Sequence, residues 1–408
     1  MNDDEYGPRL LSPLREEPAG PPAIDVVRAM REGRRMRRRR WWTGGSALAA
    51  LLAAGLTGGL LVADRGTPRP DPVLPAACAP GALPIGLHEN VEVTGGDPTG
   101  AWIVGYSREP RGSGIPSSIL VWHNGALVTD VKPPALKKGS GGVWMNDVNS
   151  SGVAVGGNFD GDPEPYVIEG GRIRKLAGGI GDADAINEAG VIAGKVVARG
   201  EPPTSERPAR WASPGAEPVL LPLPDDLNKI ATKVVDVAGD GTVIGGINMK
   251  AYLWRPDGSH GYLKLPAIEG ERVNGFTPMA LRQGWLYGAL FTSPPGATSP
   301  PRPGIGKAAV HRYELRTGAW QKVADDLRQA QVAGDNAERF VQDEPKTYDG
   351  LSILDLPPYV TPAPAPDASP GGTSVEVLSD DAGVASGTTV GFEADGSMTA
   401  VPVIWRCR

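Results

Sequence analysis

The sequence DAINEAGVIAG at residues 184–194 is the clearest copy of a unit that recurs along the chain. Two close copies are DVNSSGVAVG at residues 147–156 and DVAGDGTVIG at residues 236–245. Three weaker copies centre on the glycine pairs Gly100/Gly105, Gly284/Gly288 and Gly383/Gly387. The two glycines are four residues apart in five of the six copies and five apart in the copy at Gly100. A unit repeated in this way predicts that one supersecondary structure is built several times over.

Each copy predicts four short antiparallel strands. Strand one ends at Asn or Asp, and a glycine then supplies the positive φ of a tight turn. Strand two is rich in Val and Ile and ends at the second glycine. Strand three ends near an aromatic residue, and strand four follows a glycine turn and closes with text such as LKLP at residues 263–266. The aromatic residues are Trp122, Tyr166, Trp211, Trp254, Tyr313 and Trp405.

The spacing of the copies indicates the fold class. The first glycines of successive copies are 52, 38, 51, 43 and 99 residues apart, and four short strands every 40–50 residues or so are typical of propeller blades. We therefore predict an all-β chain that forms a six-bladed β-propeller, and the 99-residue gap leaves room for a seventh blade. A pair of stacked β-sandwiches is the alternative, because it also contains many short strands. The fixed glycines and the aromatic residue in one slot favour the propeller.

The pattern A-x-x-x-N-x-x-G-x-x-x-G, from Ala183 to Gly194, is followed by a strand that ends in Trp211. This text resembles the HAF repeat of bacterial extracellular proteins, clearly over residues 90–260 and loosely over the rest. The resemblance implies an exported, propeller-like module without a settled activity. The Trp-Asp dipeptide of WD40 repeats is missing from the sequence, which argues against that class of propeller.

The two ends of the propeller region complement each other. The last copy stops at strand three, within residues 401–408, whereas CAPGALP at residues 78–84 has the turn and Leu-Pro character of strand four. We therefore expect the N-terminal segment to complete the final blade. Cys78 and Cys407 would then be neighbours and form a disulfide, because oxidation is permitted outside the cytoplasm. Two unpaired thiols or an intermolecular bridge are the alternatives.

The charge distribution argues against a nucleic-acid partner. Residues 1–42 hold ten Arg and seven acidic residues, and the remainder holds 31 basic and 40 acidic residues. A main domain with a net charge of −9 cannot neutralise phosphates, which requires clustered Lys and Arg. The dense basic run lies before residue 41, and an apolar segment follows it directly.

That apolar segment predicts a membrane anchor. Residues 43–63 carry no charge, and about 21 helical residues span roughly 31 Å, the thickness of a hydrocarbon core. Eight arginines between Arg28 and Arg40 place the N-terminus in the cytoplasm by the positive-inside rule. A cleaved signal peptide is the main alternative. We expect no lipidation at Cys78, because a Pro-rich linker separates it from the apolar segment.

These features predict four regions. Residues 1–40 form a disordered cytoplasmic tail with a basic juxtamembrane part, residues 41–63 a transmembrane helix, and residues 64–77 a Pro-rich stalk. Residues 78–408 form an extracytoplasmic β-propeller, with an insertion at 323–374 whose part from Ala324 to Phe340 reads as helical. The predicted location is the plasma membrane, with one span and the C-terminal domain outside.

No catalytic, cofactor-binding or metal-binding residue can be assigned from the sequence. The four histidines, His88, His123, His260 and His311, lack the spacing of metal ligands. The segment from Asn158 to Asp162 has alternating oxygen ligands that are similar to part of a calcium loop, but an acidic turn explains it as well. Long loops between strands two and three, and between blades, are expected on one face of the propeller, where they would form a binding surface.

The sequence therefore favours a membrane-anchored binding or interaction module, whose ligand is an unidentified protein or glycan of the cell envelope. An exported hydrolase or lactonase of propeller type is the alternative, with residues that converge from several blade loops and leave no local motif. A third hypothesis is transmembrane signalling through residues 23–40. No cofactor is predicted.

Overall fold

The computed structural model describes residues 77–108, 116–134, 142–158, 163–198, 200–201, 205–224, 232–247, 250–296, 307–324, 340–341, 346–349, 352–357, 359, 373–392 and 398–408. The chain divides into two units, Met1–Trp41 and Trp42–Arg408, and all described residues belong to the second. The predicted tail and membrane helix, and all of the predicted stalk except its last residue, lie outside the described residues. No helix in the described ranges is long and apolar enough to cross a membrane.

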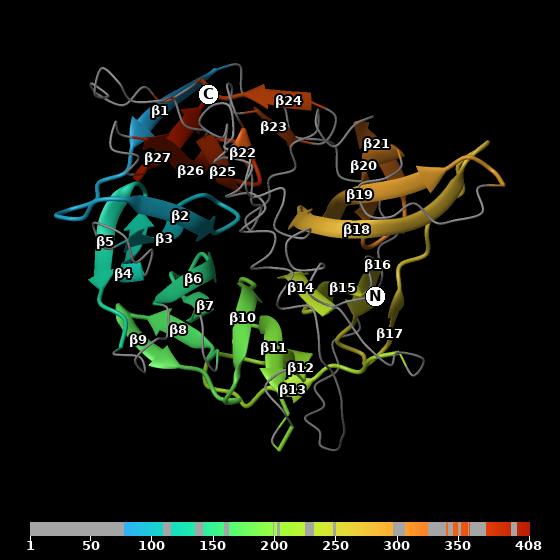
Figure 1. Ribbon diagram of the computed structural model, residues 1–408, viewed down its shortest axis with the longest axis horizontal. Helices are drawn as coiled ribbons and strands as arrows, with labels where there is room; N and C mark the ends of the chain where they lie inside the picture. Colours follow the sequence, from blue (N-terminus) through green and yellow to red (C-terminus); the bar gives the residue numbers. More distant parts are fainter. Residues whose placement is uncertain are drawn as a thin grey trace, which may run out of the picture. The chain divides into compact units, whose positions relative to one another are not determined.

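The described residues form antiparallel sheets, and in five of them four consecutive strands lie side by side in sequence order (Figure 1). Sheet I contains β2 (Val91–Gly96), β3 (Trp102–Arg108), β4 (Pro116–His123) and β5 (Ala126–Val131). Sheet II contains β6 (Val143–Val148), β7 (Ala154–Asn158), β8 (Tyr166–Glu169) and β9 (Arg172–Lys175). Sheet III contains β10 (Gly181–Ile186), β11 (Ile192–Val197), β12 (Glu206–Trp211) and β13 (Val219–Leu220).

Two further sheets keep the same order. Sheet IV contains β14 (Thr232–Val237), β15 (Val243–Ile247), β16 (Lys250–Trp254) and β17 (His260–Tyr262). Sheet V contains β18 (Arg272–Arg282), β19 (Trp285–Ser293), β20 (Lys307–Glu314) and β21 (Trp320–Ala324).

Sheet VI draws its strands from both ends of the described chain. Its order is β1 (Cys78–Ala82), β27 (Met398–Cys407), β26 (Val384–Phe392), β25 (Thr373–Leu378) and β22 (Phe340–Val341). A separate two-stranded sheet contains β23 (Lys346–Asp349) and β24 (Ser352–Asp355). The residues between the predicted ends of the insertion helix, Ala324 and Phe340, lie outside the described residues, and the two end residues themselves belong to β21 and β22.

Hydrophobic clusters join each sheet to the next. Each cluster combines buried side chains of two sheets: Val104 with Met145 (I and II), Val155 with Trp211 (II and III), Ala185 with Trp254 (III and IV), Leu253 with Phe276 (IV and V), Tyr287 with Trp405 (V and VI), and Val377 with Trp122 (VI and I). Sheet VI thus packs against both sheet V and sheet I. A closed succession of antiparallel sheets, here five with four strands and one with five, is the β-propeller architecture. Stacked sandwiches would bury each sheet against one partner, so that alternative is wrong.

The second glycine of the repeat lies opposite a β-bulge. In sheet II the register of strand one shifts between Met145 and Asp147, and Gly156 pairs with Met145. A Cβ on Gly156 would lie 2.0 Å from the carbonyl oxygen of Trp144. In all six sheets the corresponding Cβ would lie 1.8–2.5 Å from a backbone oxygen of strand one, at Gly105, Gly156, Gly194, Gly245, Gly288 and Gly387. The sequence repeats this glycine because the bulge leaves no room for a side chain.

A hydrogen bond joins the repeat tryptophan of one sheet to the Leu-Pro segment that follows strand four of the preceding sheet. The indole Nε1 of Trp254 in sheet IV donates to the carbonyl oxygen of Pro222 at 2.6 Å, directly after the buried Leu221 of sheet III. The same pairing joins Trp122 to Pro84, Trp211 to Ala177 and Trp405 to Pro357. The Leu-Pro text therefore lies beyond strand four rather than within it, as β17 shows by ending at Tyr262. Proline has no N–H to donate to the sheet.

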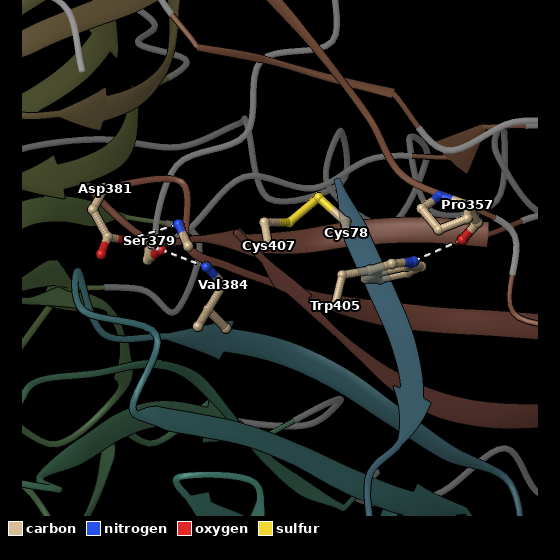
Figure 2. Close-up of a disulfide and its surroundings, with 8 residues drawn as sticks. Cys78, Pro357, Ser379, Asp381, Val384, Trp405 and Cys407 are labelled. Atoms are coloured by element: carbon tan, nitrogen blue, oxygen red, sulfur yellow. Dashed lines mark hydrogen bonds between the residues drawn. A yellow bond between two sulfur atoms is a disulfide. The ribbon is translucent and has the colours of Figure 1, made fainter. Parts of the chain in front are cut away.

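The N-terminal segment completes sheet VI, as the sequence predicts. Strand β1 pairs antiparallel with β27, with Cys78 opposite Cys407 and Ala82 opposite Val403. A disulfide joins the two cysteines across 329 residues of sequence (Figure 2). Figure 2 also shows the hydrogen bond from Trp405 of β27 to Pro357, which lies outside the sheet. Leu356 and Pro357 fall within the predicted insertion, yet they have the repeat's Leu-Pro role.

One glycine of the repeat does not have its expected conformation. Gly100, Gly152, Gly190, Gly241 and Gly284 have the positive φ expected of the first glycine. In sheet VI the positive φ of 56° belongs to Ala382, and Gly383 is not among the residues with positive φ. The turn of sheet VI is therefore one residue longer than the glycine spacing predicts. In sheet VI the residue with positive φ, Ala382, and the second glycine, Gly387, are five residues apart. The same separation is found between Gly100 and Gly105 in sheet I.

Candidate functional site

The turns between strands one and two form hydrogen bonds from sheet to sheet at one end of the strands. In sheet III the side-chain oxygen of Asn187 accepts from the backbone N–H groups of Ala189 and Val191, at 3.0 and 2.9 Å. Its side-chain nitrogen donates to the carbonyl oxygen of Ala238 in sheet IV, at 2.8 Å. Asn149 of sheet II donates to the carbonyl oxygen of Asn187 at 3.1 Å. The repeat's Asn therefore both closes its own turn and joins it to the next sheet.

Other residues join the turns of the remaining neighbours. The Ser150 hydroxyl of sheet II donates to Asp97 of sheet I at 2.6 Å. The backbone N–H of Asp380 in sheet VI donates to the carbonyl oxygen of Pro98 in sheet I at 2.7 Å. Arg282 of sheet V donates to the carbonyl oxygen of Asp380 at 2.7 Å. Five of the six junctions between neighbouring sheets are thus joined by hydrogen bonds at the turns.

The junction between sheets IV and V differs from the other five. At the position of the repeat's Asn, sheet IV has Ala238, which has no side-chain donor or acceptor. Sheet V has a two-residue turn, Gln283-Gly284, in which both residues have positive φ. The side-chain amide of Gln283 donates to Asp380 of sheet VI, on the other side. Among the described residues, no hydrogen bond joins the turns of sheets IV and V.

A cavity of about 750 Å³ lies at this junction. We call it the IV–V groove. It is lined by the turns between strands one and two and between strands three and four of both sheets. The lining residues are Ala238, Gly239, Asp240, Thr242, Leu253, Arg255, Pro256, Asp257, Gln283, Gly284, Trp285, Glu314, Leu315 and Arg316.

The charged side chains that line the groove differ in how many hydrogen bonds and ion pairs they form. Asp240 accepts from the backbone N–H of Thr242, and Asp257 accepts from that of Ser259, both at 2.8 Å. The hydrogen bonds from Ser259 lower the pKa of Asp257. Glu314 accepts from a backbone N–H and lies 3.6 Å from the guanidinium of Arg316. The exposed guanidinium of Arg255 has no hydrogen bond or ion pair among the described residues. Its charge contributes to the lowered pKa of Asp257, and its N–H groups can donate to a bound anion.

The groove was not predicted from the sequence. Most residues of the long loops that we expect to form a binding surface lie outside the described residues, so that expectation stays a prediction. A signal for the groove exists nonetheless: within the three clearest copies of the repeat, Asn149 and Asn187 are matched by Ala238. Ala238 thus marks sheet IV as the sheet whose turn has no side-chain amide to donate to the turn of the next sheet.

The histidines and the calcium-like segment have local roles. His88 lies 2.8 Å from Asp130, His123 stacks on Trp102, and His260 contacts the hydroxyl of Tyr252. Burial lowers the pKa of His311. The side-chain oxygen of Asn158 accepts from the backbone N–H of Glu164, whereas residues 159–162 lie outside the described residues. In the described ranges, no group of three or more His, Cys, Asp or Glu residues is placed to hold a metal ion.

Replacing Asn187 with Ala is expected to lower the free energy of unfolding by about 2 kcal/mol. The change removes the acceptor of two N–H groups and the donor to Ala238, and three hydrogen bonds at about 0.5–1 kcal/mol each amount to about 2 kcal/mol. Urea denaturation of the full chain measures the effect. The exposed Glu217, on the turn between strands three and four of the same sheet, supplies the control: Glu217→Ala should change stability by less than about 0.5 kcal/mol. Equal values for the two variants would contradict the assigned role of the Asn.

A buried ionic cluster lies in sheet III, away from the groove. The ammonium group of Lys195 lies 3.3 Å from Glu206, and Asp182 pairs with Lys195 in the register of the sheet. Burial raises the pKa of Asp182 well above its usual value of 3.8, and the charge of Asp184 raises it further. Burial alone would lower the pKa of Lys195, but the carboxylates of Glu206 and Asp184 raise it above its usual value.

This cluster predicts that stability falls as the pH rises from about 4 through the raised pKa of Asp182. The folded state binds a proton there more tightly than the unfolded state, so its contribution is complete below the unfolded pKa and is lost above the folded one. Asp182→Asn removes this titration. Its melting temperature should therefore depend less on pH over that range than that of the unaltered chain. Parallel curves for the two proteins would show that Asp182 titrates normally.

The comparisons with known proteins concern the fold. No family model matches the chain, and no curated protein sequence is similar to it. Among solved structures, a putative TolB from Agrobacterium tumefaciens is similar at 12% identity, 57% coverage of this chain, 80% of that chain and a TM-score of 0.35. The propeller domain of the Trilobed protease from Pyrococcus furiosus is similar at 12% identity, with 56% of this chain and 65% of that chain covered and a TM-score of 0.36. A gluconolactonase from Xanthomonas campestris is similar at 11% identity, with 83% of this chain and 99% of that chain covered and a TM-score of 0.35.

These similarities are low. The assignment of a β-propeller therefore rests on the chain's own sheets and on the hydrophobic clusters that join them.

Proposed function

We propose that the chain is a single-span membrane protein whose exported, six-bladed β-propeller binds a ligand of the cell envelope in the IV–V groove. The observation that carries this proposal is the position of the groove. It lies at the junction where sheet IV departs from the repeat and where, in the part of the chain that the structure describes, no hydrogen bond joins the two turns. Departures from a repeat in an otherwise consistent fold are expected at functional sites.

The proposed number of blades is supported by the packing clusters. Six sheets are joined by six clusters, and the sixth cluster returns to the first sheet. The described strands β23 and β24 form a two-stranded sheet of their own, which favours an insertion over a seventh blade.

The proposed location is supported by the disulfide and by the sequence before it. Disulfides persist in oxidising compartments and are rare in the cytoplasm. The structure contains a disulfide between Cys78 and Cys407. The uncharged residues 43–63 follow the arginine cluster, which favours a cytoplasmic N-terminus. Residues 64–77 would then connect the membrane directly to β1. The resemblance to the HAF repeat agrees with export.

The binding function is tested by photo-crosslinking in intact envelopes. The full chain is expressed with a photo-reactive phenylalanine analogue in place of Asp257, on the rim of the groove. The matched control places the same analogue at Glu217, on the equivalent turn of sheet III. We expect a discrete cross-linked product from position 257 and none from position 217.

Besides the absence of a product from position 257, two results would contradict the binding function. One is an identical pattern from both positions, which would indicate random contact. The other is a cross-link from position 257 that survives Ala238→Asn, a change that places a side chain in the groove. The product should instead disappear with that variant.

A further inference from the structure

The junction between sheets II and III shows what the turn N–H groups of this repeat bind. The backbone N–H of Ser150 in sheet II lies 3.1 Å from both carboxylate oxygens of Glu188 in sheet III. The next N–H, of Ser151, donates to the side-chain oxygen of Asn149 at 3.1 Å. A carboxylate from the neighbouring sheet and an amide oxygen therefore satisfy these two donors.

The same two donors in sheet IV have no partner among the described residues. By alignment of the turns, Gly239 corresponds to Ser150 and Asp240 to Ser151. Ala238 supplies no side-chain oxygen, and the turn of sheet V, Gln283-Gly284, brings no carboxylate. Both N–H groups belong to residues that line the IV–V groove. Adjacent backbone N–H groups in a turn form a binding site for an anion.

Other lining residues limit the kind of anion. Arg255 adds a guanidinium, which pairs well with a carboxylate. The carboxylates of Asp240, Asp257 and Glu314 also line the groove, and they disfavour a dianion such as phosphate. Arg316, which lies 3.6 Å from Glu314, brings the lining to two guanidiniums against three carboxylates. A singly charged anion is therefore held by the two N–H groups and Arg255, and the net charge of the groove does not contribute.

The wall of the groove limits the rest of the ligand. Leu253 and Trp285 are already only 3% and 4% exposed, so the apolar surface that a ligand can still cover belongs to Pro256 and Leu315, which also line the groove. An apolar group next to the carboxylate would bury additional apolar surface against these side chains. The hydroxyl-rich ring of a uronic acid would not gain this contribution.

We propose that the IV–V groove binds the C-terminal carboxylate of a peptide whose last residue is apolar. The carboxylate takes the place that Glu188 and the oxygen of Asn149 occupy at the junction of sheets II and III, and Arg255 completes its contacts. Capture of a chain terminus by backbone N–H groups is an established mode of peptide recognition. This inference rests on the proposed binding function and names its ligand class.

The test uses the full chain in detergent and three probes: N-acetyl-Gly-Leu, its C-terminal amide and glucuronic acid. Calorimetry or NMR titration measures the affinities. We expect the free carboxylate to bind at least tenfold more tightly than the amide, and Arg255→Gln to weaken the peptide about tenfold. Glu217→Ala is the control and should leave the affinity unchanged.

Ala238→Asn is the most specific variant. The new side-chain oxygen should accept from the N–H groups of Asp240 and Thr242, as Asn187 does in its own turn. The variant should therefore lose peptide binding by more than tenfold and unfold at a higher urea concentration. Loss of binding with a raised midpoint separates a blocked site from a misfolded protein.

Several outcomes would overturn the proposal. They are equal affinity for the peptide and its amide, unchanged affinity in Ala238→Asn, binding of glucuronic acid in preference to the peptide, and no peptide binding at millimolar concentration. If the photo-cross-link from position 257 persists while N-acetyl-Gly-Leu neither binds nor competes, the peptide proposal fails and the binding function stands. If the cross-link is absent as well, both fail.

Discussion

Replacing both Cys78 and Cys407 with Ala is expected to lower the free energy of unfolding by about 5 kcal/mol. The disulfide closes a loop of 329 residues, and the loss of chain entropy in the unfolded state grows with the logarithm of loop length, to about 5 kcal/mol for a loop of this size. The bond also pins the first residue of β1, the strand that joins sheet VI to sheet I. Urea denaturation of the full chain under oxidising conditions measures the loss.

The control for this prediction is chemical reduction of the unaltered chain. Treatment with a reductant should reproduce the loss of the double variant and should have no effect on the double variant itself. A loss below about 1 kcal/mol would contradict the account. It would mean that β1 is held by its backbone pairing alone, or that the unfolded chain is already compact.

Replacing Gly245 with Ala is expected to lower the free energy of unfolding by about 3 kcal/mol. The added Cβ would lie 2.5 Å from the carbonyl oxygen of Lys233 and 2.7 Å from the ring of Trp254. Both contacts are too short, so the bulge in β14 and the indole would have to move, at the cost of overpacking a buried site. Denaturation of the full chain measures this effect as well.

The next residue supplies the matched control. Gly246 lies in the same strand, but a Cβ there would meet Pro278 at an ordinary 3.8 Å, and its φ is not positive. Gly246→Ala should therefore be neutral, or stabilising by about 0.5 kcal/mol through the unfolded state. Similar losses in the two variants would show that the strand, rather than the bulge, requires glycine.

Several features of the fold could be predicted from the sequence because they depend on local backbone constraints. A bulge that excludes a Cβ requires glycine in every sheet, so Gly156 and its equivalents appear as a repeat. A four-residue turn favours Asn or Asp at its first position and glycine at positive φ. The missing strand of the last copy and the two cysteines then indicated how sheet VI is completed.

Other features depend on contacts between sheets, which a single repeat unit does not contain. The indole of Trp254 binds the carbonyl oxygen of Pro222 in the preceding sheet, so the Leu-Pro text was wrongly placed in strand four. Ala382 has positive φ because the turn of sheet VI is one residue longer than the spacing of Gly383 and Gly387 predicts. The IV–V groove depends on an absent side chain, and an absence becomes informative only when the neighbouring turns are known to bind each other.

Amide hydrogen exchange of the full chain tests the central claim most directly. We claim that the N–H groups of Gly239 and Asp240 are open to a ligand, whereas those of Ser151 and Ala189 already donate to the side-chain oxygens of Asn149 and Asn187. The amides of Gly239 and Asp240 should therefore exchange quickly in the free protein, and those of Ser151 and Ala189 slowly. Ala238→Asn should slow the exchange of Asp240. Equally slow exchange in all three turns of the free protein would contradict the account.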